Sequence, residues 1–144
     1  MHILIIPSWY PEKAGDIGGS FFREQAIALH KKGHKVGVIF TNLRSLREWR
    51  NIFDNLGKKI TIDEGVVTYR YQSINITPRL NELVYRHWLL LSKKLYVEYV
   101  RNYGKPDIIH VHSMNKAVFL AQFLYKKYRV PFVITEHSSA FARG

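Results

Sequence analysis

Short apolar runs alternate along the chain with longer segments in which apolar residues recur every three or four positions. Uninterrupted apolar runs of this length are typical of strands that are buried on both faces, and they fall at residues 2–6, 35–41, 107–111 and 131–135. The spacing of three to four predicts helices over residues 20–32, 43–56, 78–102 and 114–128. Two alternating runs, 58–63 and 66–71, flank Glu64-Gly65 and predict a hairpin.

The order of these elements predicts the fold. A strand, a loop with glycines, a helix and a second strand occupy the first 41 residues, and such a βαβ unit requires a parallel sheet. The sequence therefore predicts one α/β domain over residues 1–144. Its sheet would be Rossmann-like, doubly wound and mostly parallel, with helices on both faces. Ligands of such sheets bind beyond the carboxyl ends of the strands. Polar residues and glycines collect there, in residues 7–19, 112–115 and 136–139.

Composition and charge narrow the class of protein. Hydrophobic residues make up 47% and charged residues 23%, as in ordinary globular domains, and no apolar run reaches the roughly 18–20 residues that span a bilayer. The chain has no cysteine, which removes thiolate nucleophiles and zinc–sulfur sites, and we expect a cytoplasmic protein. The net charge of +11 favours an anionic partner. Nucleic acid is not the expected one, because no nucleic-acid-binding module is present.

Gly18-Gly19 opens the first predicted helix directly after the first loop. Glycine lets a phosphate approach the backbone, and the N-terminus of a helix favours negative charge. The pair fits neither the dinucleotide fingerprint nor the phosphate-loop motif of nucleotide hydrolases. A plain turn is the alternative interpretation.

Two histidines, His110 and His112, alternate at the end of a predicted strand. They share one face, but no third ligand has suitable spacing, so we expect no metal. His110 is expected to pack or to bond to the backbone, whereas His112 would face the cleft and bond a sugar hydroxyl or a phosphate, or exchange a proton. Glu136-His137 is a second polar pair at a strand end, and the alternative there is a helix cap formed by the following serines.

The predicted helix at 43–56 is rich in basic residues. An apolar stripe that includes Trp49 would cover the sheet, and three arginines lie beside it. Trp49 and these arginines are candidates for contact with a membrane or an anionic acceptor; the set is Arg44, Arg47, Trp49 and Arg50. A surface helix with no ligand is the simpler interpretation.

Four segments taken together resemble a known family. MHILIIPSWYP, GDIGGSFFREQAIALHKKGHKV, PDIIHVHS and PFVITEHS occur in the order found in the N-terminal half of family-4 retaining glycosyltransferases of the GT-B fold. The resemblance implies that Gly18 and Gly19 approach the diphosphate of a nucleotide-sugar and that His112, as a catalytic residue, points toward the transferred sugar. It also implies that the same cleft is lined by Ser113, Asn115, Glu136 and His137. Residues 43–100 would shape the choice of acceptor and contact with an anionic membrane surface.

The resemblance also implies a second domain, which would hold the nucleotide-sugar and is absent from this sequence. We therefore expect a truncated N-terminal domain that is inactive alone. Its parent would be a hexosyltransferase-type enzyme that needs no cofactor or metal and acts on a saccharide or phospholipid-linked acceptor. The alternative is a stand-alone, flavodoxin-like binding module for an anionic ligand or a protein partner.

Overall fold

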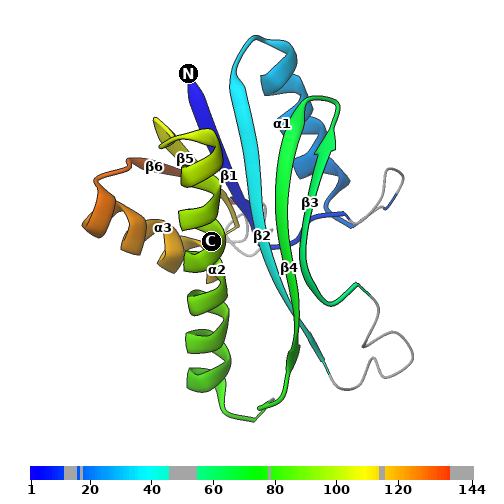
Figure 1. The fold of residues 1–144 in the computed structure, drawn as a ribbon, viewed down its shortest axis with the longest axis vertical. Coiled ribbons are helices and arrows are strands. Elements are labelled where there is room, and N and C mark those ends of the chain that lie inside the picture. The colour runs from blue at the N-terminus through cyan, green and yellow to red at the C-terminus, as the bar shows by residue number, and fades with distance from the viewer. Residues whose placement is uncertain (12–15, 17, 46–54, 78, 114–115, 137–144) are drawn as a thin grey trace, which may run out of the picture.

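A computed structural model of the protein describes residues 1–11, 16, 18–45, 55–77, 79–113 and 116–136. These residues form a six-stranded sheet in the order β3-β4-β2-β1-β5-β6 (Figure 1). The strands are β1 (His2–Pro7), β2 (Lys35–Ser45), β3 (Gly57–Asp63), β4 (Val66–Asn75), β5 (Ile108–His112) and β6 (Phe132–Thr135). The helices are α1 (Ser20–Lys31), α2 (Asn81–Tyr103) and α3 (Lys116–Tyr128). No helix in these ranges is long and apolar enough to cross a membrane.

Every strand pairing is parallel except the one between β3 and β4, which is antiparallel. The prediction of a mostly parallel, doubly wound sheet is thereby confirmed, as is the hairpin around Glu64-Gly65. Since parallel strands run in one direction, their carboxyl ends meet along one edge of the sheet, where ligands of such folds bind.

Alternation along the strands sends successive side chains to two separate cores. Ile3 and Ile5 of β1 pack under α1, whereas Leu4 and Ile6 pack under α2 and α3 on the other face. Helices therefore cover both faces of the sheet, as predicted.

The prediction of a helix over residues 43–56 is wrong at its start. Leu43 and Arg44 belong to β2, which pairs with β4 without interruption as far as Ser45 and Asn75. Ladder hydrogen bonds to β4 outweigh the helical spacing of the apolar residues, since local propensity is a weak preference that tertiary pairing overrides. Gly57, the residue directly after the predicted helix, begins β3, and residues 46–54 lie outside the described part of the chain.

Candidate functional site

The loop after β1 folds back onto the start of α1. Gly19 occupies the N-cap position with a φ of 80°, a left-handed conformation that favours glycine. A Cβ at Gly19 would lie 3.1 Å from Cδ1 of Trp9 and 3.2 Å from Cδ of Pro11, whereas a Cβ at Gly18 would meet nothing within 4 Å. The fold therefore requires glycine at position 19. At Gly18, by contrast, the space beside the N-terminus of α1 is open.

The N-terminus of α1 is suited to an anion. Its first turn holds no acidic side chain, and its last turn holds His30 and Lys31. Because no acidic side chain in the first turn offsets the positive end of the helix dipole, a ligand with negative charge is favoured at the N-terminus of α1.

His112 ends β5 beside Pro7 of β1 and Thr135 of β6. Its backbone oxygen accepts hydrogen bonds from the Ser8 amide at 3.3 Å and the Ser8 hydroxyl at 3.2 Å. Its imidazole is fully buried, with the ring centre 4.8 Å from that of Phe22 in α1. We expected this imidazole to face the cleft; in this structure the Phe22 ring packs against it instead.

The other predicted residues lie at the same strand ends or outside the described chain. Ser113 follows β5 with a φ of 71°, and its amide donates to the Thr135 oxygen at 2.9 Å. Glu136 is half-buried directly after β6. The His110 ring lies 2.7 Å from the Thr135 hydroxyl and packs on the His112 ring at 4.1 Å between ring centres. Asn115 and His137 lie outside the described residues.

Of the four residues proposed for surface contact, Arg44 alone lies in the described part of the chain. Arg44 is only 9% exposed and lies within β2, so its burial argues against the membrane or acceptor contact for which it was a candidate. Arg47, Trp49 and Arg50 lie outside the described residues. Within the described part of the chain, no three His, Asp or Glu side chains converge where a metal ion could bind.

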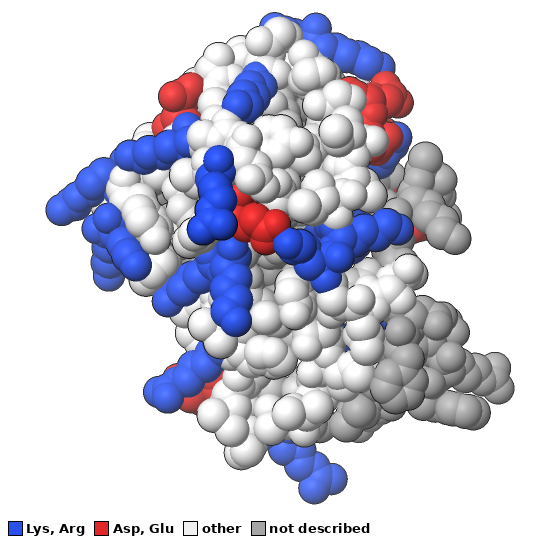
Figure 2. Space-filling model, in the orientation of Figure 1, with Lys and Arg blue, Asp and Glu red and all other residues white. Residues whose placement is uncertain are grey.

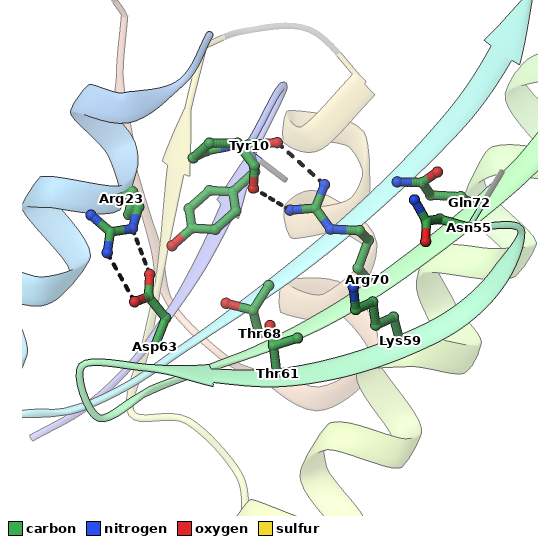
Figure 3. A pocket seen from close by; sticks show the side chains of 10 residues that line it. Tyr10, Arg23, Asn55, Lys59, Thr61, Asp63, Thr68, Arg70 and Gln72 are labelled. Atoms are coloured by element: carbon green, nitrogen blue, oxygen red, sulfur yellow. Dashed lines mark hydrogen bonds and ion pairs between the residues drawn. The ribbon is translucent and has the colours of Figure 1, made fainter. Parts of the chain in front are cut away.

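A pocket of about 310 Å³ opens between α1 and the β3–β4 hairpin (Figure 3). Its base consists of Thr68, Arg70 and Gln72, which are buried on one face of β4. Lys59 and Thr61 of β3 are exposed at its mouth. Our sequence analysis missed this pocket, although the alternation of polar and aromatic residues in VTYRYQ, within a strand buried on both faces, was a detectable signal.

Hydrogen bonds and charges hold the wall of this pocket in place. The Arg70 guanidinium donates to the backbone oxygens of Tyr10, at 3.3 Å, and Pro11. Arg23 donates two hydrogen bonds to the Asp63 carboxylate, from Nε to Oδ2 at 2.5 Å and from Nη2 to Oδ1 at 2.9 Å. This contact raises the pKa of the Arg23 guanidinium. Burial raises the pKa of the Tyr10 phenol. Arg70 thus ties the loop after β1 to the hairpin.

Comparison with known proteins gives one family. The model of Glycosyltransferase Family 4 matches residues 18–143, a span that contains Gly18, Gly19, His112, Glu136 and most of the pocket. The search of curated proteins gives no match.

Proposed function

Because the chain belongs to glycosyltransferase family 4, we propose that it is the acceptor-side domain of an enzyme that transfers a sugar from a nucleotide-sugar. The transfer would proceed with retention of configuration, from a hexose donor to a saccharide or lipid-linked acceptor. One observation carries the proposal: the glycine-lined N-terminus of α1 lies beside the carboxyl ends of β1 and β5, with Phe22 joining the helix to His112.

Each part of this arrangement would have a chemical task. The amides at the start of α1 would attract the donor diphosphate, and Gly18 would allow its close approach. Because the His112 imidazole is fully buried against Phe22, it would act near the transferred sugar only when the Phe22 ring moves aside, and Ser113 and Glu136 would line the same cleft. Stabilising the leaving diphosphate needs charged groups from both sides of a cleft. We therefore propose that this domain acts with a second, donor-binding domain, needs no metal or other cofactor, and does not transfer sugar alone.

A transfer assay tests the proposal. The protein that carries this domain together with a donor-binding domain is incubated with a panel of nucleotide-sugars, and release of UDP or GDP is measured. We expect release with one donor, and at least a tenfold loss in His112→Asn. His110→Asn is the matched control, because His110 lies on the same strand face two residues away, and circular dichroism checks the fold of both variants.

Two results would contradict the proposal. Absence of release with every donor would favour the stand-alone binding module. An equal loss in His110→Asn and His112→Asn would show that these histidines only maintain the fold.

We also propose that the domain lies at the cytoplasmic face of an anionic membrane. The solvent-facing side of α2 carries Leu83, Leu90 and Val97, which are 46%, 52% and 49% exposed. Basic residues alternate with them at helical spacing and follow them, namely Arg86, Lys94 and Arg101. Figure 2 shows Lys and Arg side chains spread over this face, with fewer acidic ones. Apolar and basic side chains on one exposed helix face suit an anionic lipid surface.

Sedimentation with lipid vesicles tests this second proposal. Binding to vesicles that contain phosphatidylglycerol should exceed binding to phosphatidylcholine vesicles, since each basic residue near an anionic surface contributes about 1 kcal/mol. The variant Leu90→Ser with Lys94→Gln should lose most of this binding. Lys32→Gln, an exposed change next to α1, is the control, and equal loss in both variants would refute the assignment to α2.

A further inference from the structure

We propose that a groove between α2 and α3, lined by Lys93, Phe123 and Lys127 among others, holds the phosphate headgroup of an anionic lipid. The lipid would anchor the domain at a place remote from the proposed sugar-transfer cleft. Naming a membrane as the source of the lipid rests on the membrane contact proposed above, whereas binding of a single lipid molecule does not. Three features support the proposal: cations that converge from two helices, apolar side chains beside them, and the position of the groove in the fold.

The groove brings basic side chains of two helices together. Its volume is about 620 Å³, and its lining includes Lys93, Lys94 and Arg101 of α2 and Lys127 of α3. The Lys93 ammonium lies 3.6 Å from the centre of the Phe123 ring, and the Lys127 ammonium lies 5.7 Å from the same centre. The ring attracts both cations, but each ammonium has three hydrogen-bond donors and a flexible stem. A phosphate beside the ring can therefore accept hydrogen bonds from both helices.

The acidic residue of the groove is already paired. Glu98 is the one acid among the described residues that line it, and its Oε1 accepts a hydrogen bond from Lys58 Nζ at 2.5 Å. The other four basic residues of the lining form no ion pair with any acidic residue in the described part of the chain. Like charges gathered in this way repel one another, and a bound anion offsets that repulsion. The groove therefore favours an anionic ligand.

Apolar side chains beside these cations favour a lipid over a free phosphate ion. Leu90 and Val97 line the groove and are 52% and 49% exposed. A phosphate ion would leave both side chains in water, whereas the glycerol and the first acyl carbons of a lipid would cover them. A second copy of this chain is a poor occupant, because the net charge of +11 makes two copies repel each other.

The basic residues of the groove lie toward the amino ends of the parallel strands. α2 runs back from the carboxyl end of β4 (Figure 1), and at its C-terminus the Tyr103 oxygen accepts a hydrogen bond from Lys35, the first residue of β2. Arg101 precedes Tyr103 by two residues, and Lys127 lies in the last turn of α3. His112, by contrast, ends β5 at the carboxyl edge of the sheet. A lipid in the groove would therefore serve as an anchor and not as the acceptor of the sugar.

Calorimetric titration of the full chain tests the inference without a membrane. The probe is dihexanoyl phosphatidylglycerol, kept below the concentration at which it forms micelles. Dihexanoyl phosphatidylcholine is the control for net charge, and glycerol 3-phosphate is the control without acyl chains. We expect the anionic lipid to bind at least tenfold more tightly than either control, and we expect added salt to weaken its binding.

The matched variants are Lys127→Gln and Lys126→Gln. They make the same change at adjacent, exposed residues in the last turn of α3, but only Lys127 is among the described residues that line the groove. Lys127→Gln should weaken binding of the anionic lipid at least fivefold, and Lys126→Gln should leave it within twofold. Lys93→Gln should weaken binding by a similar factor to Lys127→Gln, although the two lysines belong to different helices. Circular dichroism checks the fold of each variant.

Three results of the titration would overturn the inference. Equal weakening by Lys126→Gln and Lys127→Gln would indicate a diffuse electrostatic attraction. Binding of glycerol 3-phosphate as tight as that of the lipid would indicate a soluble phosphate as the ligand. Equally tight binding of a polyglutamate peptide would indicate an acidic protein partner.

Vesicle sedimentation separates this inference from the membrane contact proposed above. Sedimentation that persists unchanged in a variant with both Lys93→Gln and Lys127→Gln would overturn the groove as an anchor and leave the membrane contact standing. Binding of dihexanoyl phosphatidylglycerol by a chain that does not sediment with phosphatidylglycerol vesicles would refute the membrane contact and leave the headgroup site standing. Neither measurement depends on sugar transfer, so failure of the transfer assay would leave both results intact.

Discussion

The two adjacent glycines at the start of α1 should respond in opposite ways to substitution by alanine. Gly19 has a φ of 80°, and atoms of Trp9 and Pro11 lie close to where its Cβ would be. At Gly18 the position of the Cβ is open space. We predict that Gly19→Ala destabilises the fold and that Gly18→Ala does not, although Gly18→Ala impairs use of the nucleotide-sugar. The pair thus separates the needs of the fold from the needs of a ligand.

The expected magnitudes follow from the local geometry. A left-handed backbone costs an alanine about 1–2 kcal/mol, and contacts of 3.1 Å and 3.2 Å with Trp9 and Pro11 add to this, so Gly19→Ala should lose about 1–3 kcal/mol. At Gly18 the alanine meets no neighbour and mainly restricts the unfolded chain, which can stabilise a protein by about 0.4–1 kcal/mol. The two variants should therefore differ in the sign of their effect.

Urea unfolding followed by circular dichroism measures the free energy of unfolding of each variant. Gly19→Asn is a useful third variant, because asparagine tolerates the left-handed conformation better than alanine does, and it should recover part of the loss. In the transfer assay, Gly18→Ala should lower the rate at least tenfold, which corresponds to about 1.4 kcal/mol. Equal stability losses in Gly18→Ala and Gly19→Ala would refute the reasoning, as would a Gly19→Ala protein as stable as the original.

Three further predictions concern stability. Gly37→Ala would place a Cβ 2.2 Å from the buried Tyr99 hydroxyl, so it should lower the free energy of unfolding by about 1–3 kcal/mol, and by much less in a Tyr99→Leu background; equal losses in both backgrounds would contradict the clash. Burial lowers the His2 pKa from 6.5, so the folded state takes up this proton less readily than the unfolded state. Stability should therefore fall as the pH drops below about 6.5, and urea titrations should show a shallower fall in His2→Gln. Burial raises the Tyr96 pKa to about 12 from 10.0, so stability should fall as the pH rises above about 10, less steeply in Tyr96→Phe, and an identical pH profile in that variant would contradict this origin.

Most of the fold could be predicted because its signals are local. Apolar runs such as residues 2–6 and 107–111 are typical of buried strands, and turn residues mark their ends. The error at residues 43–45 arose because Leu43 fits an apolar helical stripe with Leu46 equally well. Their true conformation depends on pairing with β4, some thirty residues further along the chain, and no local pattern reports such a pairing.

The candidate site could be predicted only in part, for a related reason. Strand ends can be located in a sequence, so the positions of Gly19 and His112 followed from it. The burial of the His112 imidazole depends on Phe22, a contact between α1 and β5 across ninety residues. The pocket depends likewise on the register that places Lys59 opposite Arg70. Such juxtapositions arise from the packing of distant segments, and the sequence alone leaves them open.

The position of Trp9 gives this domain an intrinsic optical reporter. The indole is 46% exposed, lies 5.5 Å from the Phe22 ring between ring centres, and packs against the position of Gly19. Trp88, by contrast, is buried on the other face of the sheet and donates to the Thr41 oxygen at 2.9 Å. Collisional quenchers in water therefore reach Trp9 far more readily than Trp88. In a Trp49→Phe variant, which removes the third tryptophan of the sequence, shielding of Trp9 from such a quencher would follow occupancy at the start of α1 in real time, without a label attached to the protein.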